Sequence, residues 1–103
     1  MRHMIRHIVK LGHYADFMAA MAAWNDAARS VGLPPYRVWE SQFGTVQEVF
    51  TEAEFESIEA HLTALEAAHR HEHFATVNQE LSSHLVDGSL HDYILFEGEP
   101  RPA

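Results

Sequence analysis

The feature that most restricts the fold is a switch from strand-like to helix-like spacing of apolar residues within the first 31 positions. The segment MIRHIVKL, residues 4–11, is short, rich in β-branched residues and followed by glycine, which is typical of a strand that is apolar on both faces. Between residues 14 and 31 the apolar side chains recur every three or four positions, as on one face of an amphipathic helix: Phe17, Met21, Trp24, Ala28 and Val31. Gly32, Pro34 and Pro35 predict the end of this helix.

The next two segments, YRVWESQF and VQEVFTEAEF, predict a β-hairpin. They flank Gly44-Thr45, and a two-residue loop with glycine first suits a type II′ turn. The resulting register pairs Phe43 with Val46, Ser41 with Glu48, Trp39 with Phe50 and Arg37 with Glu52 on one face, and leaves Tyr36, Val38, Val49, Ala53 and Phe55 on the other. Aromatic and opposite-charge pairs of this kind each stabilise a ribbon by roughly 0.2–1 kcal/mol.

The second half of the chain predicts a bent or two-piece helix and a last strand. Ser57 is a suitable N-cap, followed by Ile58, Leu62 and Leu65 facing inward, and the pattern resumes with Phe74, Val77, Leu81 and Leu85. The helix is expected to end near Asp87-Gly88, and LHDYILF is expected to form the final strand. The order β-α-β-β-α-β over residues 1–103 predicts one α+β, ferredoxin-like domain with helices on one face of an antiparallel sheet.

That architecture leaves the other sheet face uncovered. The predicted register places four large apolar residues there: Trp39, Phe43, Val46 and Phe50. Because such a patch is large for the solvent side of a monomer, we expect two copies to pair face to face as a homodimer, with Arg37, Glu48 and Glu52 near the rim. The alternative is that the faces are swapped and these aromatics fill the helix-facing core.

Composition excludes several classes of protein. Seven basic against fifteen acidic residues give a net charge of −8, which is the wrong sign for a nucleic-acid surface. The chain has no cysteine, and it has no apolar stretch near the roughly 20 residues of a membrane span and no signal-peptide pattern. We therefore expect a cytoplasmic protein that binds neither nucleic acid nor membrane.

Three segments, RHIVKL, SQFGTVQEVFTEAEFES and LVDGSLHDYIL, carry a resemblance to NIPSNAP-like proteins of the dimeric α+β barrel superfamily. The resemblance covers nearly the whole chain and implies the fold and the dimer. NIPSNAP-like proteins commonly have an Asp-Pro-x-Trp-like segment where this chain has HEHF. Phe74 takes the aromatic position, while His71 and Glu72 replace the acid and the proline, so this histidine cluster is particular to this chain.

The segment RHIVKL is also similar to the first strand of stress-responsive A/B-barrel proteins. That family includes a polyketide cyclase in which a strand histidine and a helical histidine act together, without a cofactor, in a pocket between sheet and helices. The resemblance implies His7 as the strand histidine and His73 as the helical one, with His71 as the competing assignment.

Strand alternation supports a special place for His7, which shares one face with Ile5, Val9 and Leu11. A histidine in an apolar wall is either an acid–base group or ligand anchor, or a structural residue with a hydrogen-bond partner. Four further residues are candidates to line a ligand cavity, although the aromatic ones also suit the core: Tyr14, Tyr36, Trp39 and Glu40.

The cluster His69, His71 and His73 has three interpretations. On a continuous helix, His69 and His73 lie one turn apart and could hold a metal ion if a third ligand, such as His7, joined them. His73 could instead join His7 in a pocket, or the cluster could be a solvated polar flank. We expect a small-molecule enzyme or binder that needs no cofactor and acts on an apolar, oxygenated molecule through His7 and His73. The alternatives are a non-catalytic dimeric module and a metal or haem protein that uses the helical histidines.

Overall fold

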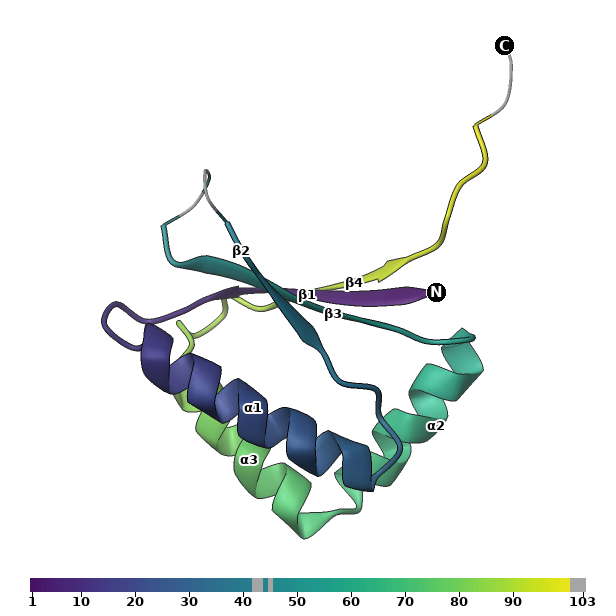
Figure 1. Ribbon diagram of the computed structural model, residues 1–103, viewed down its shortest axis with the longest axis horizontal. Helices are drawn as coiled ribbons and strands as arrows, with labels where there is room; N and C mark the ends of the chain where they lie inside the picture. The colour runs from purple at the N-terminus through teal and green to yellow at the C-terminus, as the bar shows by residue number, and fades with distance from the viewer. Residues whose placement is uncertain (42–43, 45, 101–103) are drawn as a thin grey trace.

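The computed structural model describes residues 1–41, 44 and 46–100. Its elements follow the predicted order, with the second helix divided in two (Figure 1): β1 (Arg2–Ile8), α1 (Tyr14–Ser30), β2 (Arg37–Glu40), β3 (Glu48–Glu54), α2 (Ile58–His69), α3 (Glu72–Ser83) and β4 (His91–Leu95). The predicted ferredoxin-like α+β fold is confirmed. Within the described residues, no helix combines the length and the apolar character that crossing a bilayer requires.

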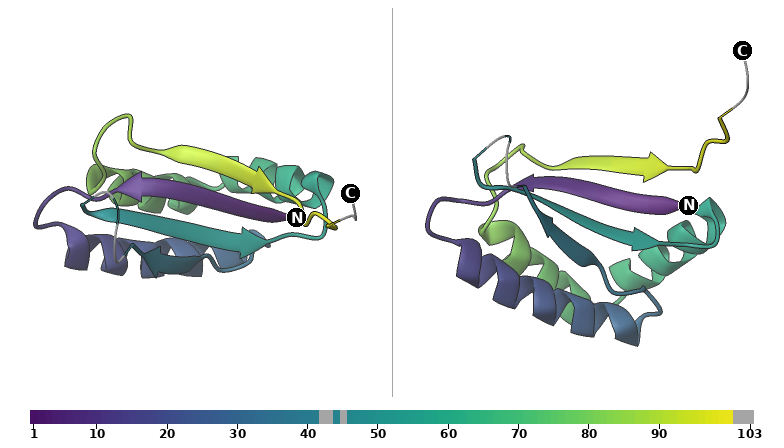
Figure 2. Two further views of the ribbon diagram at one scale, coloured as in Figure 1. Left: turned by 90° about the horizontal axis from the view of Figure 1, so that it is seen from above. Right: turned by 45° about the horizontal axis from the view of Figure 1, so that its top comes forward.

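The four strands form one antiparallel sheet in the order β2-β3-β1-β4 (Figure 2). The predicted hairpin register is confirmed where Arg37 lies opposite Glu52 and Trp39 lies opposite Phe50. Phe43 lies outside the described residues, as does Thr45, so the Phe43–Val46 pair and the turn type stay predictions.

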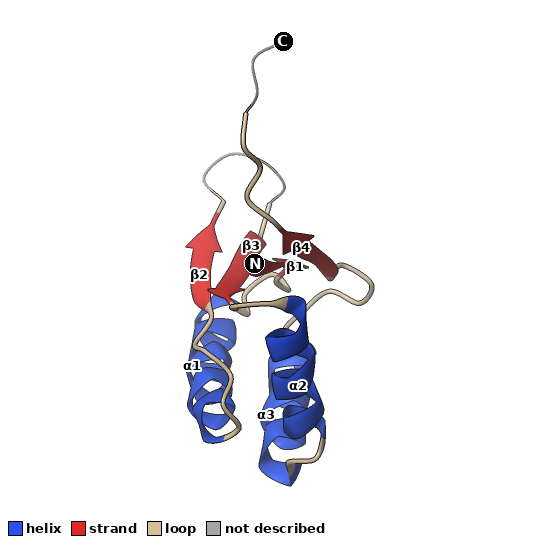
Figure 3. Cartoon of the chain, turned by 90° about the vertical axis from the view of Figure 1, so that its right-hand side faces the viewer, coloured by secondary structure: helices blue, strands red, loops and turns tan. Residues whose placement is uncertain are grey.

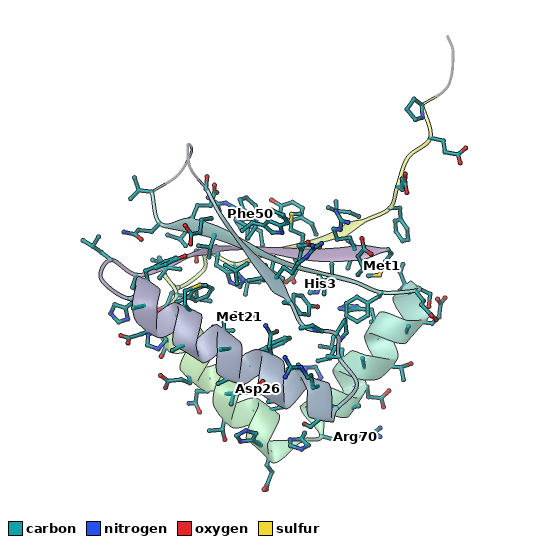
Figure 4. The ribbon with its side chains drawn as sticks, viewed as in Figure 1. Met1, His3, Met21, Asp26, Phe50 and Arg70 are labelled. Carbon is teal, nitrogen blue, oxygen red and sulfur yellow. The ribbon has the colours of Figure 1, made fainter. Side chains whose placement is uncertain are left out.

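The helices cover one face of the sheet (Figure 3). α1 lies below β2 and β3, while α2 and α3 lie on the side of β1 and β4. The main core joins strand and helix residues that the spacing predicted to face inward, including Phe17, Met21 and Val49. In Figure 4, Met21 lies on the helical side of the molecule and Phe50 on the opposite side of the sheet.

The first strand begins and ends earlier than predicted. It covers residues 2–8 and is followed by a single bridge between Val9 and Leu85. Leu11 was expected on the buried face but is 84% exposed, because the chain has left the sheet and turns at Gly12, where φ is +83°. The alternation of inward residues now includes His3, which is buried as His7 and Val9 are.

The predicted relation between His69 and His73 is wrong, because they lie on different helices. α2 ends at His69, and His71 caps α3 by accepting a hydrogen bond from the backbone N–H of Phe74 at 3.3 Å. A continuous 3.6-residue repeat across this break therefore does not exist. The Ser57 cap is confirmed, since its side chain accepts from the N–H of Ala60 at 3.1 Å.

The inward face of α2 also differs from the prediction. Ile58 and Leu62 are 40% and 55% exposed, whereas His61 and Ala68 are buried. The buried pair lies on the face next to the predicted stripe, where His61 contacts His3 and Phe55 and Ala68 joins a core cluster. A polar residue, His61, consequently faces the interior.

The sheet face opposite the helices carries Trp39, which is 52% exposed, and Phe50, which is half-buried. The swapped-face alternative is therefore wrong. Glu52 is buried on this face and forms ion pairs with Arg2 at 3.2 Å and Arg37 at 2.9 Å, while the indole N–H of Trp39 donates to it at 3.1 Å.

Candidate functional site

A cavity of about 680 Å³ lies between the helix-facing side of β1 and β4 and the helices. Its walls are largely apolar and aromatic, with Trp24 and Phe74 among them. The polar residues that line it are His3, Tyr36, His61, His69, Asn78, Gln79 and Asp92. An apolar cavity of roughly 300–1,000 Å³ with a few convergent polar groups is typical of a small-molecule site.

A hydrogen-bonded chain of three side chains runs along the sheet side of this cavity. The Nε2 atom of His3 lies 2.7 Å from Oδ1 of Asp92, and its Nδ1 atom lies 2.6 Å from the hydroxyl of Tyr36. Because an ionised carboxylate only accepts hydrogen bonds, the proton between His3 and Asp92 belongs to Nε2. The other ring nitrogen then either accepts from Tyr36 or, when His3 is protonated, donates to it.

Two hydrogen bonds to the side chain of Asn25 hold the backbone of Tyr36 in place. The side-chain amide of Asn25 donates to the carbonyl of Tyr36 at 3.0 Å, and its amide oxygen accepts from the N–H of Tyr36 at 2.8 Å. The ring meets Trp24 edge to face at 5.1 Å between centroids. Burial, together with the charge of Asp92, raises the pKa of Tyr36, so its hydroxyl stays protonated at neutral pH and acts as a donor.

His61 lies beside this chain as a neutral base. Its ring centroid is 4.7 Å from that of His3 and 4.7 Å from that of Phe55. Burial and, to a smaller degree, the charge of the neighbouring His3 lower the pKa of His61, which keeps the imidazole uncharged at neutral pH. No side-chain hydrogen bond to this ring occurs among the described residues, so a lone pair is available to a ligand.

The cavity thus brings together a hydroxyl donor and an unprotonated imidazole. A donor can stabilise negative charge that develops on a carbonyl oxygen, and a neutral imidazole can remove a proton from the adjacent carbon. The arrangement therefore suits proton transfer next to a carbonyl group.

His7 and His73, the histidines named from the sequence, lie apart from this cavity and from each other. His7 is in the core, where Nε2 lies 3.0 Å from the hydroxyl of Thr51 and the ring lies 5.9 Å from that of Phe17. Its Nδ1 is buried without a partner among the described residues. Burial lowers the pKa of His7 to about 4. His73 is exposed on α3.

Of the four predicted ligand-binding residues, one lines the cavity and three lie elsewhere. Tyr36 lines the cavity. Tyr14 and Glu40 pair with each other elsewhere, and the hydrogen bond to Glu40 raises the pKa of Tyr14 to about 12. Trp39 lies on the open face of the sheet.

Sequence reasoning missed His3, His61 and Asp92. The signal for His3 was present, because two-residue alternation places it on the same strand face as His7. Asp92 reaches His3 because β4 pairs with β1, with Ile5 opposite Asp92. His61 reaches the cavity through the orientation of α2, which no local pattern specified.

The comparisons with known proteins bear on the fold. No protein-family model matches the sequence, and no curated protein matches it. An uncharacterised NIPSNAP domain protein from Burkholderia xenovorans has a similar structure, with a TM-score of 0.78 and 11% identity over 99% of this chain and 98% of that one. A NIPSNAP family protein from Agrobacterium tumefaciens is similar with a TM-score of 0.78 and 11% identity, over 95% and 85% of the two chains.

A more distant structural similarity is to an antibiotic biosynthesis monooxygenase, with a TM-score of 0.67 and 14% identity over 96% of this chain and 98% of that one. At such identities the similarity concerns the fold. The chain has the ferredoxin-like α+β fold of the NIPSNAP domain proteins, as its sequence predicted.

Proposed function

We propose that the cavity beneath β1 and β4 binds a small, apolar, oxygenated molecule and that the protein catalyses proton transfer next to a carbonyl group of that molecule. The observation that carries this proposal is the Asp92–His3–Tyr36 chain, which ends on the wall of a cavity of about 680 Å³. The chemistry is that expected from the sequence, but the residues assigned to it change from His7 and His73 to His3, Tyr36 and His61.

Binding follows from the lining of the cavity. The apolar part of the ligand lies against Trp24 and Phe74, whose rings are 5.2 Å apart between centroids. The carbonyl oxygen accepts a hydrogen bond from Tyr36. This division between apolar walls and a few fixed donors is the usual basis of orientation in small-molecule sites.

The proton steps balance within the site. His61 removes a proton from the carbon next to the carbonyl, and Tyr36 gives its proton to the oxygen, which forms an enol. With His3 protonated, its Nδ1 proton replaces the one that Tyr36 gave, while Asp92 holds the ring through Nε2. When the enol is conjugated with a C=C bond of the ligand, His61 returns the proton to the far carbon of that bond. The double bond then shifts and the reverse transfer through Tyr36 and His3 restores the carbonyl, which completes an isomerisation.

The test uses acetophenone as a simple aromatic ketone in deuterated buffer, with loss of the methyl proton signal followed by NMR. We expect the protein to accelerate exchange and His61→Gln to reduce the acceleration by roughly 10²–10⁴-fold, which is the usual contribution of a general base. Tyr36→Phe removes the donor and should lower the rate as well. His73→Gln, at an exposed position, is the matched control and should retain it.

Binding is measured separately with 4-nitrophenolate, a planar oxyanion that resembles an enolate and has visible absorption. Tyr36→Phe should weaken binding and abolish the absorption shift that a hydrogen bond to the oxygen produces. An absence of both binding and exchange, or equal behaviour of the Tyr36→Phe and unmodified proteins, would contradict the proposal and favour a non-catalytic module.

We also propose that two copies pair through the open sheet face. The exposed apolar residues of this face include Trp39, Tyr93 and Leu95. Its charges already neutralise one another within the chain, since Glu52 pairs with Arg2 and Arg37, and Arg2 also pairs with Glu54. Covering the face would therefore bury apolar area without isolating a charge. Sedimentation velocity at micromolar concentration should show a dimer, and a monomer there would contradict this proposal.

A further inference from the structure

A second group of chemically active side chains lies where α1 begins and α3 ends, at one end of the molecule (Figure 1). It consists of His13, the residue that precedes α1, Asp16 in the first turn of α1, and His84, the residue that follows α3. One potential ligand atom from each residue lies within 4.8 Å of the other two. None of the three lines the cavity described above.

The two imidazoles face each other through the same ring atom. The Nδ1 atoms of His13 and His84 are 3.1 Å apart, and the ring centroids are 5.3 Å apart. A tetrahedral zinc ion with Zn–N bonds of about 2.0–2.1 Å holds its ligand atoms roughly 3.3 Å apart. The observed separation is therefore close to the edge of a metal coordination tetrahedron.

Glu80 determines which ring nitrogen of His84 is free to bind a metal. The Nε2 atom of His84 lies 3.0 Å from a carboxylate oxygen of Glu80. Because that carboxylate accepts, the proton of the neutral ring lies on Nε2, and the Nδ1 lone pair points towards His13. A carboxylate that holds the far nitrogen of a histidine in this way is the usual support for a metal ligand.

The backbone holds these residues together without a metal. The N–H of Lys10 donates to the carbonyl of His84 at 2.9 Å, and the N–H of His13 donates to the carbonyl of Lys10 at 2.9 Å. The bridge between Val9 and Leu85 lies next to them. The side chain of His84 is only 12% exposed, so its position is restricted. Ligands held on such a framework bind a metal with little loss of conformational freedom.

We propose that His13, Asp16 and His84 form a binding site for one divalent transition-metal ion, with zinc as the preferred ion. The ligand atoms are Nδ1 of each histidine and a carboxylate oxygen of Asp16, and water completes the tetrahedron. Two imidazoles and one carboxylate suit zinc and its neighbours, whereas magnesium and calcium prefer sets composed of oxygen atoms. The ion ties the first turn of α1 to the end of α3.

The test is titration of metal-free, untagged protein with Co²⁺, which reports tetrahedral coordination through its visible absorption, followed by competition with Zn²⁺. We expect one equivalent of Co²⁺ per chain and complete displacement by Zn²⁺. His84→Ala and His13→Ala should abolish the bands. Glu80→Gln leaves the ligands in place and should weaken binding by about 10–100-fold, the usual effect of losing such a support.

Two further variants protect the test against misfolding and non-specific binding. Asp16→Asn removes the charge of a proposed ligand, so it should weaken Co²⁺ binding. Because the side chain is exposed, the circular dichroism spectrum should stay unchanged. The double variant His69→Ala/His73→Ala removes histidines outside the proposed site and should bind as the unmodified protein does. No stoichiometric Co²⁺ binding, or loss of binding only in the double variant, would overturn the proposal.

Discussion

Acidification should destabilise the protein through His7. The side chain is 3% exposed, and burial lowers its pKa from 6.5 to about 4. Between these two pH values the unfolded chain binds a proton that the folded chain excludes. The free energy of unfolding must therefore fall as the pH falls from 6.5 towards 4, and the loss must level off below pH 4.

The magnitude follows from the size of the shift. Each pKa unit corresponds to about 1.4 kcal/mol of difference between the two protonation states. Integrating the proton uptake from pH 7.5 to pH 4.5 gives a loss of roughly 2–3 kcal/mol attributable to His7 alone. That is a large part of the roughly 5–15 kcal/mol that stabilises a typical domain.

The assay is urea denaturation of the unmodified protein and of His7→Gln at both pH values. Glutamine does not titrate and retains a group able to hydrogen-bond to Thr51. The unmodified protein should lose roughly 2–3 kcal/mol more than the variant on acidification. His73→Gln, at an exposed position, controls for the removal of one histidine. Equal losses in the unmodified protein and His7→Gln, with an NMR titration of the His7 ring near pH 6.5, would refute the reasoning.

Three further predictions concern substitutions that should lower stability. Asn25→Ala removes both hydrogen bonds to the backbone of Tyr36 and should cost about 1–3 kcal/mol of stability. It should also slow ketone exchange, although His61 is intact. An unchanged urea midpoint would contradict this prediction. Ser57→Ala removes the cap of α2 and should cost about 1 kcal/mol, measured by thermal denaturation against Ser83→Ala as a control at the last residue of α3. Gly32→Ala meets no atom within 4 Å but imposes a side chain at φ +83°, so a destabilisation of roughly 1 kcal/mol is expected, and a stabilised variant would show that this strain is absent.

Much of the fold was predictable because it rests on local spacing. The apolar residues of α1 recur with the period of a helix, and those of the hairpin alternate with the period of a strand. The register that pairs Trp39 with Phe50 followed from the position of Gly44, because a short loop fixes which residues face each other. The break between α2 and α3 was foreseen as a bend or a division into two pieces, whereas the cap that His71 provides there was not.

The candidate site was predictable only in its chemistry. The sequence indicated histidines and tyrosines around an apolar cavity, and Tyr36 was among the residues named. Which histidine meets Tyr36 depends on the pairing of β1 with β4 and on the direction in which α2 faces. These are contacts between residues 33 and 89 positions apart, and no short-range pattern encodes them.

The sequence by itself determined the order of elements and the hairpin register, because periodicity and turn residues act locally. The tertiary structure alone decided that His3 lies between Tyr36 and Asp92, that His7 is enclosed in the core, and that His13 faces His84. Packing sets these relations, since a side chain acquires its partners and its pKa only when distant segments exclude water around it.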